Sequence, residues 1–321
     1  MCAALNYEVI EQRIRGEYSR LDMPEIYSGF HCDEFYLPMK DGVGLKTYIY
    51  RGENVPEPAP VILQRSPYVH LMPLYKTHGE CLAKRGFIYV LQFCRGTGGS
   101  EGQWEPNVNE PEDGIDTVNW LEGCDWAGNI GFWGSSYLAL TGWCIADKLP
   151  SKVKGMYLAA YGTNRFVSAY EKNLFRHDVL TSWTMENAGF PVTADYMESC
   201  MFRPHVEVDK TLWGKEIPWY REMVSAPSGN EQYWHQGFWL HLRDIPSKMN
   251  IPIIIREGWY DHHLGSSLTS YESLSEEQRK KTTLLIGCWN HINANCIEWM
   301  EPVNLKNSET ESMVPFMKSL L

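Results

Sequence analysis

The sequence predicts an α/β fold in which a mostly parallel sheet carries helices on both faces. Short apolar strands and amphipathic helices alternate between residues 60 and 161, as they do in βαβ units. A serine preceded by glycine stands at the turn between one of these strands and the next helix. Two more apolar strands follow residue 250, and each ends in polar residues. Because parallel strands end at the same edge of a sheet, these polar residues are expected to meet there.

The first elements are a hairpin and two buried strands. Residues 32–51 alternate apolar and polar side chains on either side of an Asp-Gly turn, which is typical of a β-hairpin. Residues 60–64 and 87–92 are short apolar runs, so we expect buried strands there. Residues 75–85 between them favour a helix, and Gly86 ends it.

A glycine-rich loop and a helix come next. Residues 95–102 lack the Gly-Lys-Ser/Thr end of a P-loop, and Glu101 breaks a G-x-G-x-x-G pattern, so a structural loop is the better interpretation. Residues 112–121 carry apolar side chains at helical spacing behind an acidic first turn. Residues 154–160 form a further predicted strand.

The turn at residues 134–136 lies between an apolar strand, residues 130–133, and a helix that begins near Tyr137. A serine on such a turn has the geometry of a nucleophile elbow, with its Oγ outside the backbone path and helical N–H groups beside it. The G-x-S-x-G pattern is kept up to Ser136, but its last glycine is absent, since Leu138 and Ala139 follow Tyr137. We therefore predict Ser136 as the nucleophile; a plain Gly-Ser-Ser turn is the alternative.

The alternation of strands and helices stops after residue 162. Residues 163–249 have no strong strand signal and contain many aromatic side chains, so we expect an inserted helical cap over the strand ends. The predicted division is an α/β core in two parts, residues 1–162 and 250–321, with the cap between them. The second part contributes strands at residues 251–255 and 282–286.

Both late strands end in a candidate catalytic residue. The first runs into Gly-Trp-Tyr-Asp261 and the second into Gly-Cys-Trp-Asn-His291. The chain order Ser136, Asp261, His291 is that of the α/β-hydrolase fold. A neutral histidine takes the serine proton and later returns it, while a buried aspartate fixes the tautomer and stabilises the imidazolium.

Each residue also has a purely structural interpretation. Asp261 is a suitable cap for the helix that follows it, and His291 is compatible with an ordinary loop histidine. His262 and His263 beside Asp261 suggest a metal site, but no third ligand and no H-E-x-x-H pattern accompany them, so we expect no metal. Three suitable residues at three strand ends in the right order favour the catalytic interpretation.

Composition excludes several classes of function. The net charge is −11 without a Lys/Arg run, so no nucleic-acid partner is expected. No apolar run reaches the ~20 residues of a membrane helix, and residues 1–18 lack the apolar core of a signal peptide. Nine cysteines without C-x-x-C pairs fit reduced thiols, which favours a cytoplasmic protein. A homo-oligomer stays open.

Several motifs resemble the cocaine esterase and X-prolyl dipeptidyl peptidase-like (S15-type) α/β-hydrolase family. The matching segments are Arg65–Tyr68, Arg95–Gly102, Glu112–Trp120, Gly134–Leu138, Gly258–Asp261 and Gly287–His291. The resemblance implies a Ser136–His291–Asp261 triad and an oxyanion hole made by the Tyr68 hydroxyl and the Tyr137 backbone N–H. Phe93 stands where the family usually has an aspartate, which affects a local polar network rather than the triad. The C-terminal β jelly-roll of the family is not expected within these 321 residues.

These observations together predict a serine hydrolase without a cofactor, acting on a small-molecule ester or amide through an acyl-enzyme. A carboxylic ester hydrolase is the leading interpretation; an X-Pro dipeptidyl peptidase and an acyltransferase are alternatives. An inactive hydrolase fold that binds a ligand is the non-enzyme alternative. The cap residues expected to contact an apolar or aromatic acyl group are Trp183, Trp213, Trp219 and Trp234.

Overall fold

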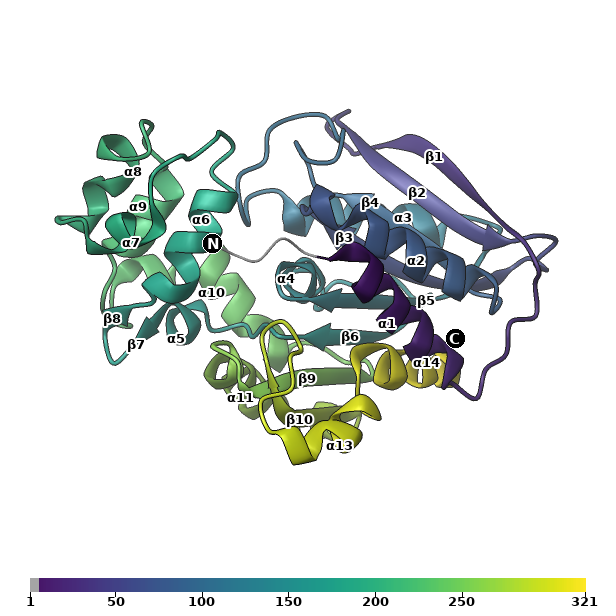
Figure 1. Ribbon diagram of the computed structural model, residues 1–321. Coiled ribbons are helices and arrows are strands. Elements are labelled where there is room, and N and C mark those ends of the chain that lie inside the picture. The colour runs from purple at the N-terminus through teal and green to yellow at the C-terminus, as the bar shows by residue number, and fades with distance from the viewer. Residues whose placement is uncertain (1–5) are drawn as a thin grey trace.

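An eight-stranded sheet forms the centre of the molecule (Figure 1), in a computed structural model that describes residues 6–321. Its strands are β1 (Phe30–Pro38), β2 (Gly44–Gly52), β3 (Ala59–Ser66), β4 (Ile88–Phe93), β5 (Ala127–Ser135), β6 (Val153–Ala159), β9 (Ile253–Tyr260) and β10 (Thr282–Asn290). They lie in the order β1-β2-β4-β3-β5-β6-β9-β10. Only β1–β2 and β2–β4 pair in the antiparallel sense, so the predicted hairpin and the mostly parallel sheet are both confirmed.

Helices cover both faces of the sheet. They are α1 (Tyr7–Ser19), α2 (Met72–Ala83), α3 (Glu110–Glu122), α4 (Tyr137–Trp143), α11 (Leu264–Glu272), α12 (Glu276–Arg279), α13 (Glu301–Leu305) and α14 (Glu309–Leu320). Successive strand residues point to opposite faces. Val61 and Leu63 accordingly pack with α3 and α4, whereas Ile62 packs with α1, α2 and α14. The core therefore has two layers of side chains, one on each face.

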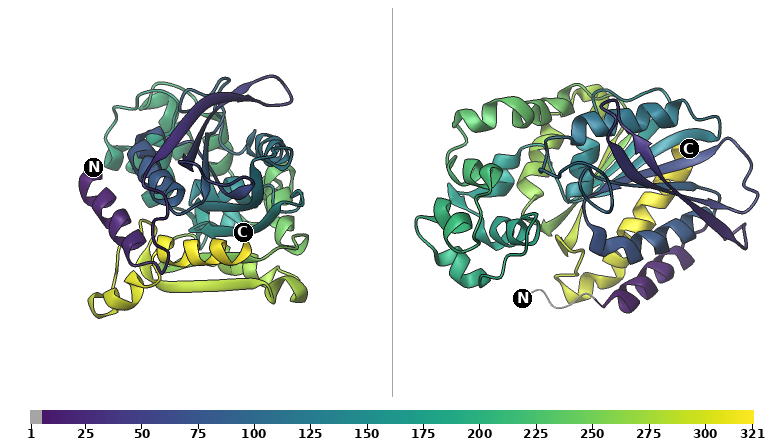
Figure 2. Two further views of the ribbon diagram at one scale, coloured as in Figure 1. Left: turned by 90° about the vertical axis from the view of Figure 1, so that its right-hand side faces the viewer. Right: turned by 90° about the horizontal axis from the view of Figure 1, so that it is seen from above.

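The helix α1 adds to the predicted elements. Its first turn is capped by the Asn6 side chain, which accepts a 3.3 Å hydrogen bond from the Val9 N–H. Figure 2 shows the purple α1 beside the yellow α14, and Arg20 after α1 pairs with Glu311 of α14 at 2.8 Å. Residues from the two ends of the described chain thus cover one face of the sheet together.

The segment between β6 and β9 lies beyond the carboxyl ends of the parallel strands (Figure 1). It contains α5 (Arg165–Ala169), α6 (Ser182–Glu186), α7 (Tyr196–Met201), α8 (Val208–Thr211), α9 (Pro218–Val224) and α10 (Gly237–Asp244). A two-stranded pair, β7 (Tyr170–Glu171) with β8 (Leu174–Phe175), adds a small element that the sequence did not predict. Because β6 pairs directly with β9, the sheet continues on either side of this segment.

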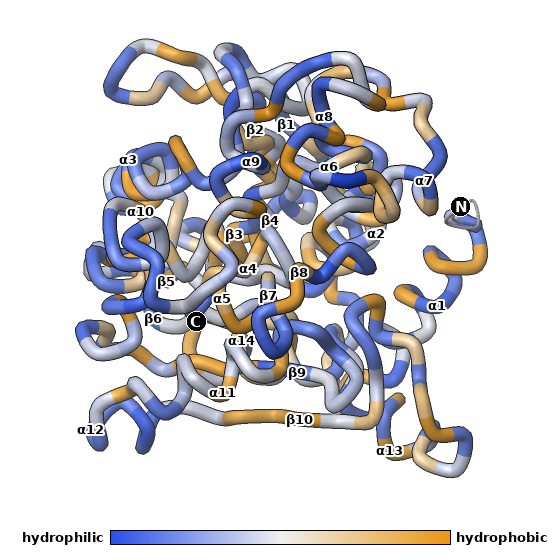
Figure 3. The backbone as a smooth tube through the Cα atoms, turned by 90° about the vertical axis from the view of Figure 1, so that its left-hand side faces the viewer, coloured by the Kyte–Doolittle hydropathy of each residue, from blue (hydrophilic) through white to orange (hydrophobic). Residues whose placement is uncertain are grey.

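Hydrophobic residues are concentrated along the strands, including β10 at the sheet edge, as Figure 3 shows. Within residues 6–321, no helix combines the length and apolar character needed to cross a bilayer. The eight cysteines in this part of the chain are all free thiols, as expected from their spacing. The glycine-rich loop after β4 is held structurally, because Arg95 pairs with Asp113 at 2.6 Å and with Asp41 at 2.6 Å.

Candidate active site

Ser136 lies on a strained turn between β5 and α4. Its backbone angles are φ 58° and ψ −129°, a conformation that side chains other than glycine rarely adopt and that is found where function requires it. A Cβ on Gly134 would lie 2.2 Å from the carbonyl oxygen of Leu138, so glycine is needed for α4 to fold back on β5. Counted from Gly134, the last glycine of G-x-S-x-G falls at Leu138 rather than at Ala139, and the Leu138 side chain is buried in the core.

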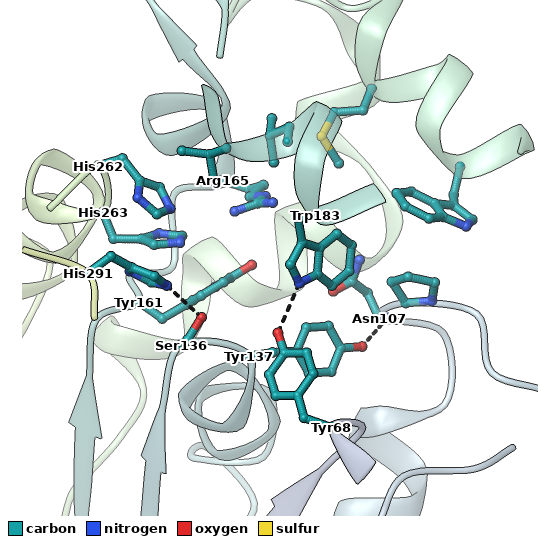
Figure 4. A pocket seen from close by; sticks show the side chains of 15 residues that line it. Tyr68, Asn107, Ser136, Tyr137, Tyr161, Arg165, Trp183, His262, His263 and His291 are labelled. Carbon is teal, nitrogen blue, oxygen red and sulfur yellow. Dashed lines mark hydrogen bonds between the residues drawn. The ribbon is translucent and has the colours of Figure 1, made fainter. Parts of the chain in front are cut away.

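The structure brings Ser136, His291 and Asp261 together (Figure 4). Ser136 Oγ lies 2.9 Å from His291 Nε2, and His291 Nδ1 lies 2.9 Å from Asp261 Oδ2. Asp261 follows β9 and is held in place by the His263 N–H, which donates to Oδ1 at 2.8 Å. Burial raises the pKa of Asp261, but its hydrogen bond and charge interaction with His291 outweigh burial and leave the pKa lowered. Asp261 is therefore a carboxylate facing the histidine.

A second carboxyl group stands behind Asp261. Glu257 of β9 is buried and accepts hydrogen bonds from the Ser267 hydroxyl and from the Gly258 N–H. Burial, with the nearby charge of Asp261, raises the pKa of Glu257 well above its ordinary range. A neutral acid at Glu257 leaves the negative charge on Asp261, opposite His291. Sequence reasoning missed this residue, because a glutamate inside an apolar strand carries no motif.

Tyr68 reaches the site from the segment after β3. Trp183 Nε1 donates a 2.9 Å hydrogen bond to the Tyr68 hydroxyl oxygen (Figure 4). Burial raises the pKa of Tyr68, so the hydroxyl keeps its proton. With its oxygen already accepting from Trp183, the Tyr68 O–H is free to donate to a negative oxygen near Ser136.

The side chain of Tyr137 is held by hydrogen bonds and by stacking. The backbone N–H of the same residue lies at the start of α4. Its hydroxyl donates to Glu110 Oε1 at 2.6 Å and accepts from the Asn107 N–H at 2.9 Å. Its ring stacks on Trp183, with centroids 6.0 Å apart and planes 19° from parallel. No side chain of the described chain caps the first turn of α4, so N–H groups there are available to an anion.

A small cavity opens above Ser136. Its lining is mainly aromatic and apolar and comprises Tyr68, Pro106, Asn107, Ser136, Tyr137, Tyr161, Arg165, Val179, Leu180, Trp183, Trp219, Met223, His262, His263 and His291. Trp183 and Trp219 of the predicted substrate contacts lie in this lining.

The prediction for Trp213 and Trp234 is corrected. Both side chains are buried in separate apolar clusters of the segment between β6 and β9. Their indole N–H groups are used internally, since Trp213 donates to Ser199 Oγ at 3.0 Å and Trp234 donates to the Ala226 carbonyl at 2.9 Å. These two tryptophans stabilise the cap and do not face the cavity.

Three histidine rings meet beside the serine. Ring nitrogens of His262, His263 and His291 all lie within 4.8 Å of one another. His291 is the third candidate ligand, which the sequence pattern did not supply. Burial lowers the pKa of His262 to about 3 and that of His263 well below its ordinary value, so both rings are neutral. Neutral imidazole is the form that binds zinc, so the donor set is suitable for a metal ion.

The model of the X-Pro dipeptidyl-peptidase (S15) family matches residues 41–293. The chain belongs to this family. It is similar to the cocaine esterase of Rhodococcus sp. (strain MB1 Bresler), with 26% identity over 282 residues, which cover 80% of this chain and 48% of the esterase. The S15 chain thus spans about half the length of the curated relative it matches. The resemblance seen in the sequence motifs is confirmed.

Solved structures share the fold of this S15 chain. An aminopeptidase of a marine-sediment Thaumarchaeota archaeon superposes with a TM-score of 0.70 at 18% identity, covering 94% of this chain and 58% of the other. An α-amino acid ester hydrolase superposes with a TM-score of 0.65 at 19% identity, covering 84% and 50%. These likenesses confirm the α/β-hydrolase fold predicted from the strand pattern.

Sequence reasoning missed Arg165 in the cavity of this S15 chain. It begins α5, six residues after β6 ends at Ala159, and β6 neighbours β5 in the sheet. Its position just beyond the carboxyl end of a predicted strand is the signal that would have identified it, because ligands bind at that edge.

Proposed function

We propose that this S15 chain is a serine hydrolase that cleaves a carboxylic ester or amide through an acyl-enzyme. The observation that carries the proposal is the continuous hydrogen-bonded chain from Ser136 through His291 to Asp261, with distances of 2.9 Å at both links. This arrangement activates a serine, since the histidine accepts its proton and the aspartate stabilises the resulting imidazolium.

The proposed reaction has two steps. Ser136 Oγ attacks the carbonyl carbon while its proton passes to His291 Nε2, and the carbonyl oxygen becomes an anion that accepts from the Tyr68 O–H and the Tyr137 N–H. His291 then gives the proton to the leaving alcohol or amine as the bond to it breaks. Water attacks the acyl-enzyme in the second step, losing a proton to His291, which returns it to Ser136.

An ester is favoured over an X-Pro peptide as the substrate. A dipeptidyl peptidase holds a free N-terminal amine, and a carboxylate is the side chain suited to a buried cation. None of the cavity-lining residues in the described chain is Asp or Glu. The X-Pro peptide is therefore the second candidate, supported by the family to which the chain belongs.

Intact mass after treatment with a fluorophosphonate tests the proposal. Wild type is expected to gain one adduct, and Ser136→Ala is expected to gain none. Ser135→Ala is the matched control, because it removes the adjacent hydroxyl at the end of β5 and is expected to keep the adduct. An adduct that persists in folded Ser136→Ala, or no adduct on folded wild type, would contradict the proposal.

A further inference from the structure

Arg165 places a guanidinium inside the cavity. The residue begins α5, and Figure 4 shows its guanidinium pointing into the space between His263 and Trp183, above Ser136. The group also lies over the ring of Tyr161, 5.6 Å from the ring centroid. An aromatic face and the adjacent helix thus hold the cation at the edge of the reaction site.

This guanidinium has no carboxylate partner in the described chain. Among residues 6–321, its single side-chain hydrogen bond runs from Nη1 to Ser168 Oγ at 3.4 Å, and its buried Nε has no hydrogen-bond partner. Arg176 nearby, by contrast, pairs with Asp178 at 2.7 Å. Leaving a buried donor of a charged group unsatisfied costs free energy, and a ligand that accepts from it recovers that cost.

The rest of the cavity provides no opposing charge. Its lining includes no Asp or Glu among the residues that the structure describes. Of the described residues that line the cavity, Arg165 is therefore the one that always carries a charge, and this charge is positive.

The position of Arg165 indicates which part of the substrate it meets. A carbonyl carbon bound to Ser136 directs its oxygen toward Tyr68 and its leaving group toward His291, which protonates that group. The remaining substituent is the acyl chain. We place it in the remaining direction, toward the space between His263 and Trp183 into which the Arg165 guanidinium points (Figure 4).

We propose that Arg165 binds a carboxylate at the far end of the acyl chain, so that the preferred substrates are monoesters or monoamides of short dicarboxylic acids. The proposal rests on the serine hydrolase function proposed above. A guanidinium donates two parallel N–H groups to a carboxylate, which gives both charge pairing and orientation. The cavity is small, which limits the acyl chain to a short one.

Two pairs of esters test the proposal by titration of the released acid. Monoethyl glutarate and ethyl pentanoate have five-carbon acyl groups, and only the first has a terminal carboxylate. We expect wild type to prefer monoethyl glutarate by roughly 10- to 100-fold in kcat/KM, the range for one charge-assisted hydrogen-bonded pair. Acetoxyacetate and propyl acetate form the second pair, with the carboxylate on the alcohol half, and no preference for acetoxyacetate is expected.

Variants at Arg165 test whether its guanidinium causes the preference for monoethyl glutarate. Arg165→Met is expected to abolish the preference for monoethyl glutarate, and Arg165→Lys to retain part of it, because lysine keeps the charge without the planar pair of donors. Arg176→Met is the matched control: Arg176 is already paired with Asp178 and does not line the cavity, so the ratio should stay that of wild type.

Failure of the carboxylate proposal can be distinguished from failure of the proposed hydrolase function. If wild type is labelled by the fluorophosphonate but shows no glutarate preference, or if Arg165→Met keeps that preference, the carboxylate proposal is overturned and the hydrolase remains. A preference for acetoxyacetate would also overturn it, since the anion would then belong to the alcohol. Absence of labelling and of turnover on every ester would instead overturn the proposed function.

Discussion

The indole N–H of Trp183 donates to the hydroxyl oxygen of Tyr68 across a distance of 2.9 Å. Trp183 belongs to α6 of the segment between β6 and β9, whereas Tyr68 follows strand β3 of the sheet. One hydrogen bond therefore connects the cap to the proposed oxyanion donor. Because the bond occupies the tyrosine oxygen as an acceptor, it directs the O–H proton elsewhere, and Ser136 lies in the same cavity.

Replacing Tyr68 with phenylalanine tests its role as an oxyanion donor. Tyr68→Phe keeps the ring and removes the O–H, so kcat is expected to fall about 10²–10³-fold, as for other oxyanion-hole donors. Steady-state kinetics on a neutral ester measures the change. Tyr36→Phe, on the exposed part of β1, is the control and is expected to leave kcat unchanged. A Tyr68→Phe enzyme with wild-type kcat would exclude this hydroxyl from the reaction.

The Trp183→Phe variant tests the connection between the cap and that donor. It retains an aromatic ring against Tyr137 but loses the N–H, so the Tyr68 hydroxyl is no longer oriented. We expect kcat to fall about 3- to 10-fold, the range for one neutral hydrogen bond. In the Tyr68→Phe background the same change should have little further effect, because the two residues act through one interaction. Additive losses in the double variant would contradict this connection.

Glu257 predicts a pH dependence of stability. Its pKa is raised in the folded protein by burial and by the charge of Asp261, so between its unfolded and folded pKa values the native state binds more protons than the unfolded state. The contribution of this pKa shift to the free energy of unfolding is fully present below the pKa of Glu257 in the unfolded chain. It is lost as the pH rises toward the pKa of Glu257 in the folded protein. The loss has a limiting slope of about 1.4 kcal/mol per pH unit.

The Glu257→Gln variant, which cannot ionise, is expected to remove that slope. The free energy of unfolding of the variant should therefore increase relative to that of wild type as the pH rises from 5 to 8. Urea denaturation at each pH measures this difference. Glu277→Gln, at an exposed position in α12, is the control and should follow wild type. A difference between Glu257→Gln and wild type that is constant with pH would show that Glu257 is ionised in the folded state.

The three-histidine cluster predicts inhibition by zinc. A Zn²⁺ ion bound to His262, His263 and His291 would occupy a ring nitrogen of the histidine that is proposed to accept the Ser136 proton. Ester hydrolysis is therefore expected to fall on addition of zinc and to recover with a chelator. His262→Gln should raise the inhibitory zinc concentration by about tenfold or more, because one of three ligands is lost. The exposed His31→Gln is the control, and equal inhibition of both variants would exclude the cluster.

The sheet and the three residues of the proposed triad could be predicted because each obeys a local rule. Apolar runs mark the strands, and Ser136, Asp261 and His291 each stand just after one of them in a recognisable chain order. The cap was harder to interpret. Its tryptophans look alike in sequence, and only the fold separates Trp183, which lines the cavity, from Trp213, which is buried in a cluster of the cap.

Arg165 and Glu257 were missed for a different reason. Their properties come from partners that the sequence does not place: the absence of a nearby carboxylate in one case, and the presence of Asp261 in the other. An arginine without an anion and a glutamate that keeps its proton have no pattern of spacing. Both depend on burial in three dimensions, which is set by the packing of distant segments.

The positions of Ser136 and His291 have a consequence for biosynthesis. The serine leaves the ribosome 155 residues before the histidine, and the histidine follows β10, the outermost strand of the parallel part of the sheet. A nascent chain therefore carries an inert hydroxyl until β10 has been translated and has paired with β9. Under the mechanism proposed above, reactivity toward an ester begins only when this side of the sheet is complete, and a chain truncated before β10 is expected to lack a reactive serine.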